Sequence, residues 1–295
     1  MRKIRQRPCC LNGGYIMYKI IIDSCGELTD ELKKDDHFKS VPLELEVDGV
    51  RIVDDESFDQ LSFLKMVEQS ENGPKSSCSS PEKYLECFRE DAQNFYVVTL
   101  SNQLSGSYNS AVLAKNLYEE EYGDAKNIYV FNSKSASVGE TLIGMKIQEC
   151  EEAGLKFEEV VEQVEAYIEE MNTYFVLESL ETLRKNGRLS NVKAFIANTL
   201  NIKPVMGSTK EGSICQLDQA RGMKKALDKM ITTMLSKTKD LEQKIVAIAH
   251  CNCPARALEV KEHIEKQAHF KDIIMVNTAG VSSMYANDGG IIMVV

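Results

Sequence analysis

The sequence predicts an α/β protein with two α/β layers. Apolar runs typical of strands alternate with helical patterns over residues 17–156, and a second alternation continues to residue 295. Between them, residues 157–171 keep an apolar helical face suited to a bridge between the halves. Such alternation is typical of sheets with helices packed on their faces. We therefore expect an N-terminal α/β domain over 17–156 and a C-terminal α/β domain over 157–295.

The first half contains strand-type runs separated by helical patterns and clear turn signals. Asp48-Gly49 predicts a hairpin, and Gly73-Pro74 predicts a break in the chain. We expect strands at 18–23, 41–47, 50–53, 95–99 and 127–132, and helices at 59–69, 81–93, 108–122 and 138–153.

The second half repeats this alternation. Its expected strands are 174–177, 202–206, 213–219, 244–249, 272–277 and 291–295, with a turn at 210–212. Its expected helices are 179–185, 192–200, 223–237 and 254–267.

Composition excludes several classes of function. A net charge of −10 without a basic stripe argues against a nucleic-acid partner. No apolar run approaches the length of a membrane span. The nine cysteines and four histidines form neither a disulfide framework nor a zinc spacing, and no phosphate-binding glycine motif occurs. We expect a cytoplasmic protein with reduced cysteines and no metal or cofactor.

Residues 1–16 have a basic start but no apolar core, so they do not form a signal peptide. Gly13-Gly14 can be encoded by a ribosome-binding sequence placed just before Met17. We expect Met17 to be the native start and residues 1–16 to be a disordered leader or extension.

The most informative stretch is 100–122, where an apolar run leads into a helix through Ser105, Gly106 and Ser107. A helix start offers free N–H groups and the positive end of the dipole, which together favour a carboxylate or phosphate. An ordinary serine cap is the alternative.

Similar loops recur along the chain. Asp23-Ser24, the run 76–80 and the serines of 133–137 each precede a helical or turn segment, and most follow strands. If those strands are parallel, their carboxyl ends share one edge of a sheet, where ligands bind in open α/β folds. The pattern therefore predicts an anion site at this edge.

From Met17 to Val295 the chain resembles the DegV family of bacterial fatty-acid-binding proteins. Each motif alone is weak evidence, but the motifs follow the family's order and spacing over nearly the whole chain. The segments that carry the resemblance are Ile22-Asp23-Ser24, Val41-Pro42-Leu43, Ser76-Ser77-Cys78-Ser79-Ser80, Leu104-Ser105-Gly106-Ser107, Glu178-Ser179-Leu180, Leu183, Gly187-Arg188-Leu189 and Arg221-Gly222-Met223-Lys224-Lys225-Ala226.

The resemblance implies a two-domain fold with a fatty acid between the domains and its carboxylate at Ser76, Ser77 and Ser105. Ser76 and Ser79 replace a usual threonine and proline, so the hydroxyl donors are kept. Arg188 matches a family arginine near the head group, with a solvated helix-end arginine as the alternative. Arg221 is expected to meet a partner or a phosphate.

The C-terminal segment departs from the family, because Tyr285 stands where many members have a histidine. Tyrosine can donate a hydrogen bond, but it is not a base near neutral pH. Any acid–base role of that histidine is therefore in doubt here.

The resemblance also implies a partner, a dihydroxyacetone-kinase-like fatty-acid kinase that phosphorylates the bound acid for phospholipid synthesis. The chain itself is then a carrier and not an enzyme. A hydrolase or transferase using a serine or Cys25 as nucleophile is the alternative, but no histidine lies near Cys25 in the sequence.

Overall fold

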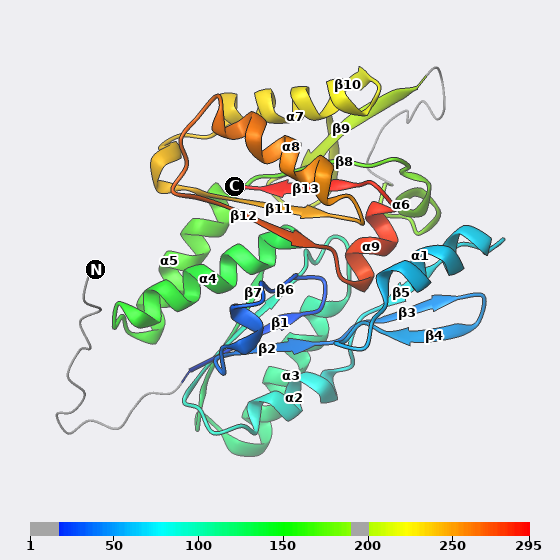
Figure 1. The fold of residues 1–295 in the computed structure, drawn as a ribbon. Helices are drawn as coiled ribbons and strands as arrows, with labels where there is room; N and C mark the ends of the chain where they lie inside the picture. Colours follow the sequence, from blue (N-terminus) through cyan, green and yellow to red (C-terminus); the bar gives the residue numbers. More distant parts are fainter. Residues whose placement is uncertain (1–17, 190–200) are drawn as a thin grey trace.

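The computed structural model describes residues 18–189 and 201–295, so the predictions for residues 1–16 and for a helix at 192–200 lie outside it. Two sheets with their helices form stacked layers, and a small third sheet lies at one side (Figure 1). The predicted α/β class is confirmed. No helix of the described residues is long and apolar enough to cross a membrane.

The first sheet is wholly parallel, with the order β2-β1-β6-β7. Every residue of β6 is buried, as expected for a parallel strand covered on both faces. Its strands are β1 (Tyr18–Asp23), β2 (Phe38–Val41), β6 (Asn94–Thr99) and β7 (Asn127–Asn132). Its helices are α2 (Pro81–Phe88) and α3 (Ser107–Tyr122) against one apolar cluster, and α4 (Val138–Glu152) and α5 (Phe157–Glu170) against another.

The second sheet has the order β10-β9-β8-β13-β11-β12, and among its described pairs β11 and β12 alone run parallel. Its strands are β8 (Thr173–Val176), β9 (Ile202–Ser208), β10 (Ile214–Arg221), β11 (Ile245–His250), β12 (Asp272–Asn277) and β13 (Ile291–Val294). Helices α7 (Met223–Lys237) and α8 (Pro254–Glu265) pack on the face turned away from the first layer (Figure 1).

Helix α4 connects the two layers. Its residues Ile143 and Ile147 belong to the core of the first sheet, whereas Val138 and Leu142 pack against Ala249 and other residues of the second sheet. Both faces of this helix are therefore buried, which explains why its apolar residues surround the helix axis.

The third sheet, β4-β3-β5, corrects one sequence prediction. The expected strand at 41–47 is wrong: β2 ends at Val41 in the first sheet, and β3 (Glu44–Val47) begins a different sheet. Pro42 lies between them, and a proline cannot donate a ladder hydrogen bond. The predicted hairpin is confirmed, since β3 pairs with β4 (Val50–Val53) and both Asp48 and Gly49 have positive φ.

Two elements that reach the site were not predicted. Strand β5 (Lys75–Ser77) includes the first two residues of the serine run 76–80 and pairs with β3, and helix α9 (Gly280–Ala286) precedes β13. The expected helix at 81–93 ends earlier, at Phe88, where Glu90 and Asp91 oppose the helix dipole. The remaining described elements are α1 (Gln60–Gln69), α6 (Glu181–Lys185) and the short helices Leu32–Lys34 and Leu241–Gln243.

Candidate ligand-binding site

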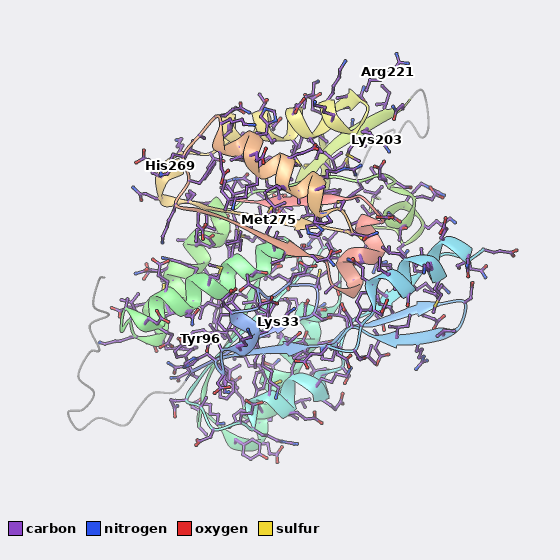
Figure 2. All side chains as sticks on the ribbon, viewed as in Figure 1. Lys33, Tyr96, Lys203, Arg221, His269 and Met275 are labelled. Atoms are coloured by element: carbon purple, nitrogen blue, oxygen red, sulfur yellow. The ribbon has the colours of Figure 1, made fainter. Side chains whose placement is uncertain are left out.

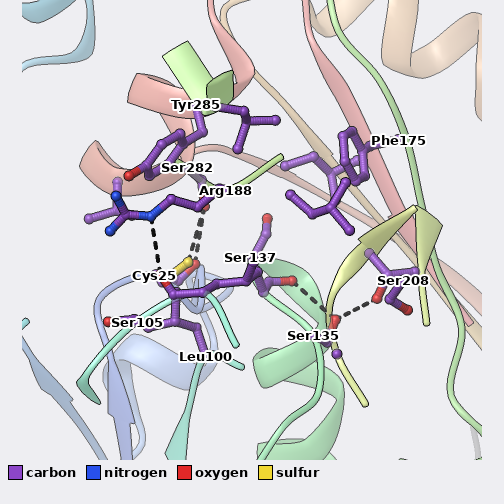
Figure 3. A pocket seen from close by; sticks show the side chains of 18 of the residues that line it. Cys25, Leu100, Ser105, Ser135, Ser137, Phe175, Arg188, Ser208, Ser282 and Tyr285 are labelled. Carbon is purple, nitrogen blue, oxygen red and sulfur yellow. Dashed lines mark hydrogen bonds between the residues drawn. The ribbon is translucent and has the colours of Figure 1, made fainter. Parts of the chain in front are cut away.

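A cavity of about 340 Å³ lies between the first and second sheets. Pockets that hold small molecules typically have volumes of roughly 300–1,000 Å³. Six of the predicted site residues line it: Ser76, Ser77, Ser105, Gly106, Arg188 and Tyr285. Figure 3 shows Ser105, Arg188 and Tyr285 at one end, with Ser135 and Ser208 at the other.

The first end, which we call the head end, takes its hydroxyls from three elements. Ser76 lies on β5, Ser105 precedes α3, and Tyr285 lies on α9. The Ser76 Oγ and Tyr285 Oη atoms lie 3.1 Å apart. Burial raises the pKa of Tyr285 above its usual value, so the group is a neutral hydroxyl near pH 7. Converging hydroxyls can together satisfy a bound carboxylate.

The start of α3 also faces the head end. Gly106 caps this helix, and a side chain at this position would approach Cys78 Sγ to 3.2 Å. Ser105 Oγ accepts a hydrogen bond from Ser107 N at 3.2 Å and lies 3.1 Å from Ser107 Oγ. Ser107 is fully buried and lies behind Ser105, outside the cavity lining. A 16-residue helix thus presents its positive end at the cavity.

Arg188 supplies the positive side chain of the head end. Its Nε donates to the Leu104 carbonyl at 3.2 Å, and Nη1 donates to the carbonyl of Asn186. Its guanidinium carbon lies 5.8 Å from the centre of the Tyr285 ring. These contacts hold a cation beside the hydroxyls, as an anion site requires.

Apolar side chains form the middle of the cavity. Phe175 lies on β8 and Leu177 directly follows that strand. The other apolar residues of the lining include Leu43, Leu100, Leu104, Leu183, Ile214, Val281 and Ile292. Phe175 and Leu177 lie two residues apart, the period of an extended strand, but the sequence did not show which face of that strand borders a cavity.

Three loops at the carboxyl edge of the parallel sheet meet at the cavity, as the sequence predicted. Cys25 follows β1, Leu100 to Gly106 follow β6, and Ser135 and Ser137 follow β7. Ser76 and Ser77 reach the site differently, from β5 of the third sheet.

A buried acidic cluster supports these loops from beneath. The Asp23 carboxylate accepts from Cys25 N at 3.1 Å and from Leu100 N at 3.0 Å, so it joins two of the loops. Glu27 accepts from Ser137 Oγ at 2.6 Å. Burial raises the pKa of Asp23 to about 6 and that of Glu27 to about 7.

Glu140 completes the cluster. It is fully buried, and neither carboxyl oxygen has a hydrogen-bond partner among the described residues. Burial and the nearby Asp23 raise its pKa well above the usual value. Polar atoms of Asp23, Cys25 and Glu140 lie within 4.8 Å of one another, a proximity that sequence spacing did not reveal. A proton held on Glu140 relieves the repulsion between the two carboxyl groups.

Arg221 lies apart from this site. It ends β10, is exposed, and is absent from the cavity lining (Figure 2). A role for Arg221 toward a partner therefore stays a prediction.

Comparisons with known proteins agree with this geometry. A family model described as "Uncharacterised protein, DegV family" matches residues 17–294. A DegV domain-containing protein of Streptococcus pneumoniae is 37% identical over 256 residues, which cover 87% of this chain and 90% of the relative.

Solved structures with the same fold contain fatty acids. A DegV family protein from Ruminococcus gnavus, refined with vaccenic acid, has a TM-score of 0.92 and 56% identity, and the match covers 95% of this chain and 100% of that one. One from Eubacterium eligens, loaded with heptadecanoic acid, has a TM-score of 0.85 and 29% identity, covering 94% and 98%. The Streptococcus pneumoniae Fatty Acid Kinase (Fak) B3 protein, loaded with linoleic acid, has a TM-score of 0.85 and 34% identity, with the same coverage.

Proposed function

This chain belongs to the DegV family, and on that premise we propose that it binds one long-chain fatty acid and presents it to a separate kinase. One observation carries the proposal. The cavity has hydroxyls, an arginine and a helix start at one end, and apolar side chains through its middle. A long-chain fatty acid has the same distribution of polar and apolar groups.

The carboxylate is placed at the head end. The Ser76, Ser105 and Tyr285 hydroxyls and the Arg188 guanidinium supply its hydrogen bonds. Tyr285 takes the place of the family histidine as a neutral donor, since a tyrosine hydroxyl is protonated near neutral pH and burial raises its pKa further. Hydrogen bonds to a charged group are roughly twice as strong as those between neutral groups.

The acyl chain is placed along the apolar middle of the cavity. Each buried CH₂ contributes about 0.8 kcal/mol, so a long chain binds tightly with few polar contacts. Enclosure between the two layers also keeps the acyl chain away from water.

We further propose that a dihydroxyacetone-kinase-like kinase phosphorylates the carboxylate while the acid is bound, for use in phospholipid synthesis. The resemblance to the Fak B3 protein supports this step. Ser77 and Gly106 are exposed, so the head end meets the surface where a kinase can reach it. Arg221 is assigned to the partner surface, distant from the acid.

The alternative, hydrolysis or transfer through Cys25, is disfavoured by the environment of the thiol. Burial, followed by the nearby Glu140, Asp23 and Glu27, raises the pKa of Cys25 well above its usual value. A thiol held in the protonated form is a poor nucleophile. Ser105 contacts Ser107, whose hydroxyl is not a general base.

Mass spectrometry under denaturing conditions tests the binding function. Protein purified from cells is expected to release about one long-chain fatty acid per chain, because an empty apolar cavity is costly. A delipidated preparation with no measurable affinity for any fatty acid would overturn the proposal.

A further inference from the structure

The cavity also has a polar far end, opposite the head end. Thr173 and Ser135 line it, and their hydroxyl oxygens lie 2.6 Å apart. Thr173 begins β8 of the second sheet, whereas Ser135 lies in the loop after β7 of the first. Both side chains are buried. This hydrogen bond therefore joins the two layers across the end of the cavity.

Strand β8 lies along the cavity between its far end and its head end. Three alternate residues line the cavity, Thr173 and Phe175 on β8 and Leu177 directly after it, so the cavity runs along this face of the strand. A strand rise of about 3.3 Å per residue separates Thr173 from Leu177 by roughly 13 Å. An acyl chain whose carboxylate lies at the head end therefore extends along β8 toward Thr173.

A second cavity, of about 470 Å³, lies directly beyond the far end. Four residues line both cavities: Lys134, Ser135, Thr173 and Ser208. The second cavity is polar and charged. Its walls include lysines and acidic residues: Lys134, Lys210, Lys237, Lys239, Lys244, Glu169, Glu170 and Asp240. A methyl end that entered it would leave apolar surroundings for a space lined by charged side chains.

We propose that Thr173, held by Ser135, is the stop that ends the acyl tunnel and sets the longest straight chain the protein binds well. This inference rests on the proposed function, since it needs a fatty acid whose carboxylate occupies the head end. The preferred ligand is then an unbranched acid whose methyl group reaches Thr173 without displacing it. Longer acids must bend, or push apart the Ser135–Thr173 contact.

The test uses the delipidated full-length chain and a series of straight-chain saturated acids that differ by two carbons each. Affinity for the parent protein is expected to rise by at most about fourfold per added methylene, as follows from about 0.8 kcal/mol per CH₂, and then to fall beyond an optimum. Thr173→Ala removes the stop, so its optimum should move at least one step toward longer acids. Thr173→Val keeps the shape but not the hydroxyl, so its optimum should remain at the parental length.

Ser135→Ala removes the other half of the Ser135–Thr173 contact. If Thr173→Ala does not fold, the optimal acid length is measured on Ser135→Ala instead. An unchanged optimum in a folded Thr173→Ala or Ser135→Ala protein would overturn the stop, and so would a parent protein whose affinity shows no optimum. A parent protein that binds no acid of any length would instead overturn the proposed function.

Discussion

The hydroxyl oxygens of Ser76 and Tyr285 lie 3.1 Å apart, although the two residues are 209 positions apart in the chain. One comes from the third sheet and the other from α9, so neither local sequence nor one element could place them together. The pair forms one side of the head end. Its geometry suits two donors that converge on one carboxylate.

Removing either hydroxyl should weaken fatty-acid binding. Ser76→Ala and Tyr285→Phe are each expected to cost about 1–3 kcal/mol in binding free energy, because each removes a donor to a charged group. Isothermal titration of delipidated protein measures the loss. Because the two hydroxyls are in contact, the double variant should lose less than the sum of the single losses.

Ser80→Ala is the matched control for this pair, since Ser80 is exposed, belongs to the same serine run and makes no side-chain cap contact. Parental affinity in both Ser76→Ala and Tyr285→Phe would place the carboxylate elsewhere.

Arg188 and Arg184 offer a matched test of the positive charge. Arg184 is exposed and pairs with Glu181, whereas Arg188 lines the cavity. Arg188→Ala should lower fatty-acid affinity by about tenfold or more, the effect of a lost charge-assisted hydrogen bond. Arg184→Ala should leave the affinity unchanged in the same titration. Equal effects of the two substitutions would show that Arg188 acts only through net charge.

The raised pKa of Glu140 lets us predict how the free energy of unfolding depends on pH. Its pKa is raised in the folded protein, so between its unfolded and folded pKa values the folded state binds more protons, and stability falls as pH rises. Asp23 and Glu27, with pKa values raised to about 6 and about 7, add to this fall over the same range. Chemical unfolding across pH 5 to 8 should therefore show decreasing stability.

Glu140→Gln should reduce that slope. Glutamine resembles the protonated acid and needs no proton, so the variant is expected to gain about 1 kcal/mol or more at pH 8, since one pKa unit corresponds to roughly 1.4 kcal/mol. Glu152→Gln, an exposed change at the end of the same helix, should alter stability by less than about 0.5 kcal/mol. A steeper slope in Glu140→Gln would mean that the carboxylate is stabilised where it lies.

The sequence was informative where chemistry and local structure coincide. The start of α3, with Ser105 and Gly106, could be located and predicted as an anion site because the strand, the loop serines and the helix start lie within one short segment. The parallel edge that gathers the loops also followed from strand and helix alternation.

The other parts of the candidate site depend on contacts between residues that are far apart in the sequence. Helix α9 is capped by Asp54, which accepts from Gly280 N at 2.6 Å and Val281 N at 2.9 Å across more than two hundred residues. The sequence around α9 does not reveal this cap, so it could not predict the helix that carries Tyr285. Thr173 likewise lies just before the strand predicted at 174–177 and carried no local signal, because its contact with Ser135 comes from the other layer.

The last prediction concerns Arg221 and the kinase. This residue is exposed at the end of β10, outside the cavity lining, so a change there should leave fatty-acid binding intact. With a dihydroxyacetone-kinase-like kinase, ATP and magnesium, the loaded parent protein should yield acyl phosphate, whereas the isolated chain should yield none. Arg221→Ala should lower the rate of phosphorylation by about tenfold or more, the effect of a lost charged contact at an interface.

Arg51→Ala, an exposed change on β4, is the control and should leave the rate of phosphorylation unchanged. Titration of the same preparations separates the two steps: a defect of Arg221→Ala confined to fatty-acid affinity would contradict its place at the partner surface, and ATP turnover by the isolated chain would contradict the carrier role itself.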